Sequence, residues 1–274
     1  LEHVYHINQW GIAESLSYPL MLAPLTIDDS PELVRQKVNL VARYIEVFAV
    51  RRAVNFKKFS ASSIRYTMCT LVKEIRRKSL TELHEILAGK LSSMEQTWEG
   101  VETFWWHGMN RKFVKFLLSR ISGYVDQECG LSTDFNTYYS NPGGKPFEIE
   151  HVWADKFNRH KDEFEQVHEF KDFRNRLGDL VLLPRGTNQS YGDLPYVEKQ
   201  PHYLKENLLE KSLCALTYQN NPNFTQMAKR LGLAFRAHSE FKRSDIEKRQ
   251  KLYRQICEII WAFEAPGEEE SSIN

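Results

Sequence analysis

Apolar side chains recur at intervals of three and four residues in three stretches of the first half of the chain. They are Leu33, Val34, Val38, Val41, Ile45 and Phe48 in the first, Ile64, Met68, Leu71, Val72 and Ile75 in the second, and Phe113, Val114, Leu117, Leu118, Ile121 and Tyr124 in the third. This spacing places them on one face of an α-helix. Ser30 followed by Pro31 predicts the start of the first helix, since serine caps helices and proline favours the first helical position. We interpret the three stripes as core packing in a helical bundle.

The second half of the chain predicts two short strands. Apolar and polar residues alternate over Phe147–Val152, as in a half-buried strand, and the run Leu177–Pro184 predicts a second, buried strand. The charged stretch 158–175 between them predicts helical or irregular structure. The segment Gly130–Pro146 is rich in Ser, Thr, Asn, Gly and Pro and predicts a loop, which is the best internal boundary.

These patterns predict a mainly α fold with a small β-hairpin. A closing helix is expected because Ser244 to Glu247 has the spacing of a capping box and Leu252, Ile256, Ile260 and Phe263 follow at helical spacing. We expect a helical domain at 1–140, a core containing the hairpin at 141–215, a C-terminal helical segment at 216–264 that packs back on the bundle, and an acidic tail at 265–274.

Composition narrows the class of protein. Hydrophobic residues make up 42% of the chain and charged residues 27%, which is ordinary for a soluble globular protein. No run of about 18 apolar residues could cross a bilayer, so we expect a cytoplasmic protein without membrane contact. The cysteines Cys69, Cys129, Cys214 and Cys257 stand singly, which favours reduced thiols. The chain starts at Leu1 without a leader, so we expect a piece of a longer protein.

A net charge of +1 decides nothing about a polyanionic partner, because binding depends on where charge lies. Between Arg51 and Lys78, nine basic residues face one acid, Glu74. Such a cluster could follow a phosphate backbone, or it could be a solvated helix face paired with acids elsewhere. The sequence leaves both readings open.

Candidate chemistry gathers at the predicted hairpin. The segment Glu148-Ile149-Glu150-His151 ends the first strand, and Asn188 follows the second strand in Leu-Leu-Pro-Arg-Gly-Thr-Asn-Gln, before Lys199 and Tyr203. This order resembles the HNH (ββα-metal) nuclease pattern, in which an acid-His pair ends the first strand of a hairpin and an Asn follows the second.

The likeness extends over about Pro31 to Trp261. Arg51-Arg52, the Phe-Leu-Leu-Ser-Arg-Ile segment around Arg120, Gly178-Asp-Leu-Val-Leu-Leu183 and Ile-Glu-Lys-Arg249 to Ile260-Trp261 resemble the C-terminal half of GmrSD-type, modification-dependent (type IV) restriction proteins. The resemblance implies a phage-defence nuclease acting on DNA, with modified DNA recognised mainly by an upstream portion. It also implies that nucleotide hydrolysis belongs to an upstream domain absent from this chain. No Gly-rich phosphate loop is visible here. Whether two copies pair as a homodimer stays open.

The chemistry gives each residue type a reason. Phosphodiester hydrolysis needs a water deprotonated near neutral pH, and a histidine with an ordinary pKa of about 6.5 suits that task, so we assign it to His151. Mg²⁺ or Mn²⁺ would stabilise the charge gained in the transition state. By resemblance, Glu150 and Asn188 are the candidate ligands, and Asn188 joins His151 in the catalytic set.

Strand geometry complicates this ligand set. Adjacent residues on a regular strand point to opposite faces, so Glu150 and His151 share a site only if the strand ends or bulges there. Glu148 or Asp155 could supply the carboxylate instead. The chain departs from the family pattern at Ala154, where a Pro often stands, and at Asp179, where an Asn often stands.

Other candidates carry weaker signals. Lys199 and Arg185 could contact DNA phosphates, as could Arg51 and Arg52. We expect Trp98, Trp105, Trp106 and His107 to pack between helices outside the site. We expect His160, His168 and His202 to be solvated rather than accessory ligands.

Two rival functions remain. One is a non-catalytic DNA-binding module that carries a degenerate hairpin. The other is a helical domain that mediates self-association, whose apparent DNA affinity would not fall as salt rises.

Overall fold

The computed structural model describes residues 1–11, 14–57, 61–187 and 191–264. These residues are mainly helical, with a single two-stranded antiparallel sheet among them, so the predicted fold class is confirmed. The chain divides into two compact units, Leu1–Gly100 with Trp261–Asn274, and Val101–Ile260. Residues 140 and 215 both lie inside the second unit, and the finer division expected from the sequence stays a prediction.

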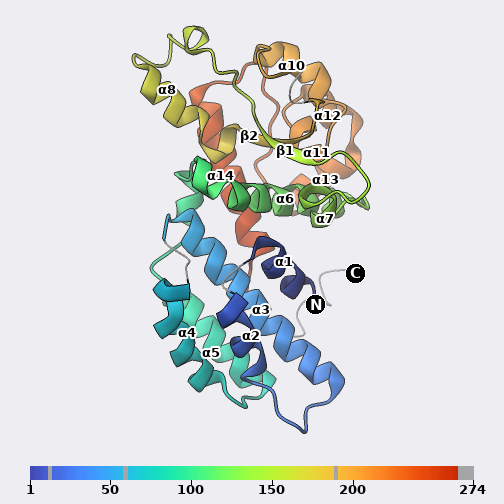
Figure 1. The fold of residues 1–274 in the computed structure, drawn as a ribbon. Coiled ribbons are helices and arrows are strands. Elements are labelled where there is room, and N and C mark those ends of the chain that lie inside the picture. The colour runs from blue at the N-terminus through green and yellow to red at the C-terminus, as the bar shows by residue number, and fades with distance from the viewer. Residues whose placement is uncertain (12–13, 58–60, 188–190, 265–274) are drawn as a thin grey trace. The chain divides into compact units, whose positions relative to one another are not determined.

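The first unit is built on one long helix. Its helices are α1 (Glu2–Trp10), α2 (Glu14–Leu22), α3 (Pro31–Val54), α4 (Ala61–Ile75) and α5 (Leu80–Ser92). The α1, α2 and α5 helices pack against α3, the long blue helix of Figure 1. Ser30 caps α3 as expected, because its Oγ accepts a hydrogen bond from the Leu33 N–H at 3.2 Å.

Two segments far apart in the sequence complete the first unit. The indole of Trp261 stacks on Trp98 with ring centroids 5.6 Å apart, and its Nε1–H donates to Glu46 at 2.9 Å. The ring of Phe263 stacks on His84 at 5.4 Å. The chain therefore leaves this unit after Gly100 and returns to it at Trp261, beside the point of departure.

The second unit holds the hairpin and the remaining elements. They are η1 (Trp98–Glu102, which spans the unit boundary), η2 (Gly108–Asn110), α6 (Arg111–Glu128), α7 (Phe135–Tyr139), β1 (Phe147–His151), η3 (Phe157–Arg159), α8 (Val167–Arg174), η4 (Leu177–Asp179), β2 (Leu180–Pro184), α10 (Tyr196–Tyr203), α11 (Leu208–Lys211), α12 (Ala215–Asn220), α13 (Pro222–Arg230) and α14 (Arg243–Ile260). Helix α6 contacts both strands, and α14 contacts η4 and α6 (Figure 1).

The sheet pairs β1 with β2 over five residues, from Phe147 opposite Pro184 to His151 opposite Leu180. The far side of β2 is covered by α11. The Leu182 N–H donates to the Glu210 carboxylate at 3.0 Å, and the Leu182 carbonyl accepts from the Asn207 side chain at 3.3 Å. These side chains satisfy backbone groups that a third strand would otherwise pair.

Three local expectations were wrong. The predicted strand Leu177–Pro184 begins as the 3-10 turn η4, and only Leu180–Pro184 forms β2. The segment 130–146 is not loop throughout, because α7 forms within it, with the Asp134 carboxylate accepting from the Thr137 N–H at 2.9 Å. Helix α14 does not begin at a Ser244 cap. It begins at Arg243, and the Asp245 carboxylate accepts from the Lys242 N–H at 3.0 Å. At the start of both α7 and α14, an aspartate carboxylate accepts the hydrogen bond that orders the first turn.

Candidate active site

His151 is the last residue of β1, and its position follows from the hairpin register. It lies opposite Leu180, the first residue of β2, and the chain leaves the sheet directly after it. Apolar neighbours bury the residue to 7% exposure. A histidine at a strand end has a fixed backbone on one side and a turn on the other.

The turn after His151 is held by a buried carboxylate. Asp179 is fully buried, its backbone carbonyl accepts from the Val152 N–H at 2.8 Å, and its carboxylate accepts from the Trp153 N–H at 3.1 Å. Burial raises the pKa of Asp179, whereas the positive charge of Arg174 opposes that rise. The residue that departs from the family pattern therefore ties the two strands together beside His151.

Trp153 anchors the same turn to the rest of the unit. Its indole N–H donates to the Phe241 carbonyl at 2.7 Å, and its own carbonyl accepts from Arg174 Nε at 3.0 Å. The indole lies flat against Phe170, with ring centroids 5.8 Å apart. These contacts fix the backbone that carries His151 without touching its imidazole.

Two residues contact the imidazole directly. Asn175, which follows α8, places its amide oxygen 3.2 Å from His151 Nε2, and the Trp106 ring lies 5.3 Å from the imidazole. A short antiparallel bridge brings them together, because Trp105 pairs with Arg176 and the Trp106 N–H donates to the Asn175 carbonyl at 2.7 Å. The site therefore combines three places in the sequence, because Asn175 lies 24 residues after His151 and Trp106 lies about 45 residues before it.

These surroundings keep His151 neutral. Burial lowers its pKa to about 3, and the nearby positive charge of Arg174 adds to the effect, although the hydrogen bond with Asn175 opposes it. A neutral imidazole carries one proton, and an amide oxygen accepts it, so we assign that proton to Nε2. Nδ1 then holds the lone pair, which makes His151 a proton acceptor at neutral pH.

The neighbouring carboxylate, Glu150, faces a buried lysine. Lys199 on α10 is fully buried, and its ammonium lies 3.2 Å from Glu150 Oε1 and donates to the His151 carbonyl at 2.9 Å. Burial raises the pKa of Glu150, whereas Lys199 lowers it. Successive side chains along a strand point to opposite faces. In agreement with this rule, Glu150 contacts Lys199, whereas the His151 imidazole contacts Asn175 and Trp106.

A comparison with protein-family models gives a match to the C-terminal domain of GmrSD restriction endonucleases over residues 66–256. The chain belongs to this family. The match runs from within α4 to within α14 and contains the whole hairpin, and it shows a restriction-endonuclease type of nuclease domain, for which DNA is the substrate. No curated protein and no solved structure matches the chain. Among the described residues of this GmrSD domain, no helix is long and apolar enough to cross a membrane.

The other predicted carboxylates of the GmrSD domain lie nearer the surface. Glu148 is partly exposed and lies 3.6 Å from Arg185 Nε, and Arg185 itself is exposed just beyond β2. Asp155 is exposed on the turn after β1. Asn188, predicted as both a catalytic residue and a ligand, lies outside the described residues. The metal and DNA roles of these side chains stay predictions.

Arg51 and Arg52, the two residues of the first unit that were predicted to bind DNA, contact other residues of that unit. Arg51 donates to the carbonyls of Gln96 at 2.6 Å and Leu91 at 2.7 Å, and so holds the segment after α5. The Arg52 guanidinium lies over the Phe48 ring at 5.5 Å. Both arginines are half-buried, and these contacts explain their positions without DNA. A DNA-binding role for either arginine stays a prediction.

Sequence reasoning missed two contacts of the candidate site. Trp106 was expected to lie outside it but packs on His151, and Asn175 was not considered. Little in the sequence indicated Asn175, because an asparagine at the end of a charged helix is common. His160 was also misjudged: it packs between Trp153, with ring centroids 4.2 Å apart, and Phe170 at 5.1 Å, and burial lowers its pKa to about 4. It is part of the core beneath the turn.

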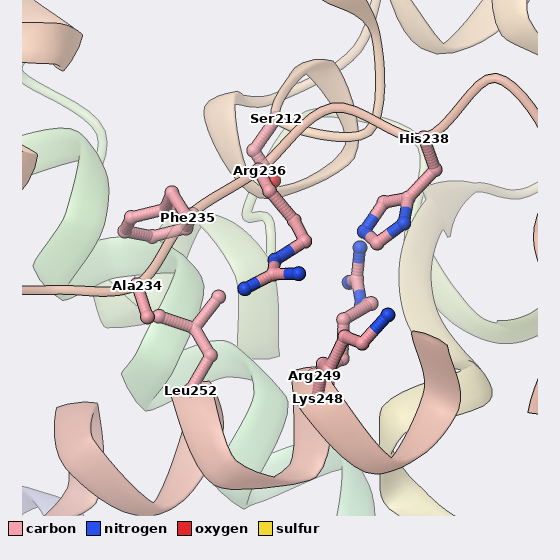
Figure 2. Close-up of a pocket in the computed structure, with 8 residues that line it drawn as sticks. All are labelled: Ser212, Ala234, Phe235, Arg236, His238, Lys248, Arg249 and Leu252. Atoms are coloured by element: carbon pink, nitrogen blue, oxygen red, sulfur yellow. The ribbon is translucent and has the colours of Figure 1, made fainter. Parts of the chain in front are cut away.

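A separate pocket lies beside α14 and gathers basic groups. Figure 2 shows Arg236, His238, Lys248 and Arg249 around it. Three of these groups have partners within the chain: Lys248 and His238 lie 3.0 and 3.3 Å from the Asp245 carboxylate, and Arg249 donates to the Tyr253 hydroxyl. Burial lowers the pKa of His238 to about 4, so it is neutral at pH 7. The hairpin, rather than this pocket, is therefore the candidate active site.

Proposed function

We propose that this domain is an HNH-type, metal-dependent endonuclease that hydrolyses DNA phosphodiesters with His151 as general base. The observation that carries the proposal is a neutral, oriented imidazole at the end of the first strand of a hairpin, inside the region matched to a restriction-endonuclease family. We further propose, from the resemblance, that modified DNA is selected by an upstream portion that also hydrolyses nucleotide.

The proton transfer depends on His151 and Asn175. Asn175 accepts the Nε2 proton and holds the ring, so Nδ1 is the atom that takes a proton from the attacking water. A pKa of about 3 makes the imidazole a weak base in the free protein. A DNA phosphate bound beside the ring would add negative charge and raise that pKa toward the working pH.

The donors around the hairpin are of the kinds that Mg²⁺ or Mn²⁺ accepts, namely carboxylate and amide oxygens and an imidazole. Glu150 and Asn188 are the proposed ligands, and Glu148 and Asp155 are the alternative carboxylates. When bound, the ion would stabilise negative charge on the phosphate and the departing 3′-oxygen. Glu150 would have to exchange its Lys199 contact for the ion, whereas Asp155 is already exposed.

Phosphate contacts are proposed at the rim of the hairpin. Arg185 is exposed and near Glu148, so it can meet a flanking phosphate. Lys199 is fully buried, and we propose that it contributes by holding Glu150 and the His151 carbonyl. Arg51 and Arg52 lie in the other unit, and we propose them as further phosphate contacts.

The test is plasmid nicking by the purified chain with Mg²⁺ or Mn²⁺, alone and joined to the upstream portion of a GmrSD protein. We expect His151→Ala to abolish nicking and leave DNA binding intact, whereas His168→Ala, a change at an exposed histidine of α8, should cut normally. Wild type that binds DNA but never cuts in either form would establish the rival binding module. DNA affinity that is independent of salt would favour self-association.

The carboxylate ligand can be assigned with the same assay. Asp155→Ala should abolish cleavage without loss of stability if Asp155 binds the ion. Glu150→Gln alone is ambiguous because it also disturbs Lys199, so it is compared with the Glu150→Gln/Lys199→Met double variant. If Glu150 is the ligand, both remain inactive. If it only pairs with Lys199, the double variant recovers cleavage.

A further inference from the structure

A second group of chemically competent side chains lies in the first unit, far along the sequence from the hairpin. His3 and His6 on α1 and Glu46 on α3 bring two imidazole nitrogens and a carboxylate oxygen within 4.8 Å of one another. Residues three apart on a helix share a face, so both imidazoles of α1 face α3, against which that helix packs. We propose that His3, His6 and Glu46 form a transition-metal site that binds Zn²⁺.

The distances suit a metal ion. His3 Nδ1 lies 2.8 Å from Glu46 Oε2, and His6 Nδ1 lies 3.4 Å from the same oxygen. Ligands at about 2.0–2.1 Å from a tetrahedral Zn²⁺ are separated by about 3.3 Å. The His6 distance already has this value, and the His3 distance needs to open by only about 0.5 Å, which a side-chain rotation supplies.

The carboxylate is oriented by its other oxygen. Glu46 is fully buried within α3, and Oε1 accepts from the Trp261 indole N–H at 2.9 Å. This bond directs Oε2 toward the two imidazoles. A buried carboxylate needs a compensating positive charge or hydrogen bonds. Oε2 has a hydrogen bond with His3 Nδ1 at 2.8 Å, which a metal ion held by both atoms would replace.

A second carboxylate lies on the far side of the His6 ring. Glu2 places a carboxylate oxygen 3.6 Å from His6 Nε2. This negative charge favours the tautomer with its proton on Nε2, which leaves the Nδ1 lone pair directed at Glu46. With this lone pair directed at Glu46, His6 is oriented to ligate a cation held by that carboxylate, and a carboxylate behind a ligating histidine is a common feature of zinc sites.

The donor set defines the class of ion. Two imidazoles and one carboxylate suit Zn²⁺ and its neighbours in the transition series, whereas Mg²⁺ prefers oxygen ligands alone. Three protein ligands leave a fourth position for water. The site is therefore distinct in chemistry from the ion proposed at the hairpin, and it lies in a segment that the family match does not cover.

The experiment titrates the full chain, stripped of metal, with Zn²⁺ against a chromogenic chelator, and with Co²⁺ followed by visible absorption. We expect His6→Ala and His3→Ala each to weaken one equivalent of Zn²⁺ by more than about 100-fold, and Glu2→Gln to weaken it by about 10-fold. The control His84→Ala, at a histidine of the same unit that stacks on Phe263, should retain that equivalent.

Two further readouts keep the result decisive. Glu46→Gln alters a buried group and could unfold the unit, so His3→Ala, whose side chain is 12% exposed, is the primary variant and its fold is checked by circular dichroism. His151→Ala should keep the Zn²⁺ equivalent, and His3→Ala should keep Mg²⁺-dependent nicking. Equal Zn²⁺ binding by wild type and a folded His3→Ala variant, or no Zn²⁺ binding by wild type, would overturn the proposal.

Discussion

Replacing Lys199 by methionine tests the buried ion pair behind His151. Methionine fills nearly the same space, so the change removes charge without leaving a cavity. It strands the Glu150 carboxylate, now 3.2 Å from the ammonium, and takes away the donor that meets the His151 carbonyl at 2.9 Å. Removing one partner from a buried pair usually costs about 3–5 kcal/mol of unfolding free energy.

The pH dependence gives a sharper magnitude. A stranded Glu150 can escape by taking up a proton, and from an ordinary pKa of 4.5 this costs at most about 3.4 kcal/mol at pH 7 and about 0.7 kcal/mol at pH 5. The lost hydrogen bond adds about 1 kcal/mol at either pH. The variant's folded Glu150 pKa lies above the unfolded one, so its stability deficit is small below pH 4.5 and grows as pH rises.

The assay is denaturant unfolding of wild type and Lys199→Met at pH 5 and pH 7. Adding Glu150→Gln should restore most of the part of the deficit that depends on pH, and the exposed control Lys205→Met should change stability by less than about 0.5 kcal/mol. An equal deficit at both pH values, or no recovery in the double variant, would show that Glu150 and Lys199 do not stabilise each other as the geometry indicates.

Three further predictions concern the frame of the site. Gly178→Ala should destabilise the fold by about 3 kcal/mol, because a Cβ there would lie 2.1 Å from the Ile246 carbonyl oxygen. The control Gly89→Ala, where a Cβ would have nothing within 4 Å, should stabilise its helix by about 0.5–1 kcal/mol. Similar melting temperatures for the two variants would contradict this prediction. Trp153→Phe should cost about 1–3 kcal/mol in denaturant unfolding because it removes the 2.7 Å hydrogen bond of the indole, and a loss under 0.5 kcal/mol would be inconsistent with that role. The pKa of His160 is about 4 in the folded protein and about 6.5 in the unfolded chain, so the unfolded state takes up protons first and stability falls as the pH drops from 6.5 to 4. His160→Phe should reduce this dependence of the melting temperature on pH between pH 4 and 7. An unchanged dependence would show that His160 does not cause it.

The periodicity of apolar residues predicted the helices and strands better than it predicted the contacts between them. The stripe from Leu33 to Phe48 and the alternation before His151 follow from periodicity, and both elements formed where expected. Helix α7 was hidden because its five residues carry no periodic stripe, and only the Asp134 cap could have indicated it. Short elements of this kind depend on capping and tertiary packing more than on pattern.

The surroundings of His151 could not be read from the sequence. Asn175 and Trp106 reach the imidazole through a backbone bridge between segments with no shared motif. The partner of Glu150, Lys199, was predicted only as a phosphate contact, since a lysine is rarely buried without a matched charge and no local pattern shows that charge. Pairing across 49 residues is a property of the fold and leaves no local trace.

The return of the chain at Trp261 has a consequence for synthesis and for dissection of the protein. A ribosome delivers all of residues 101–260 before it delivers the indole that stacks on Trp98, so the unit begun first is finished last. The intervening unit is one continuous stretch, so we expect it to fold when it is expressed by itself. For the discontinuous unit, we expect a short linker from Gly100 to Trp261 to be sufficient, because Trp98 and Trp261 near these two ends are already stacked.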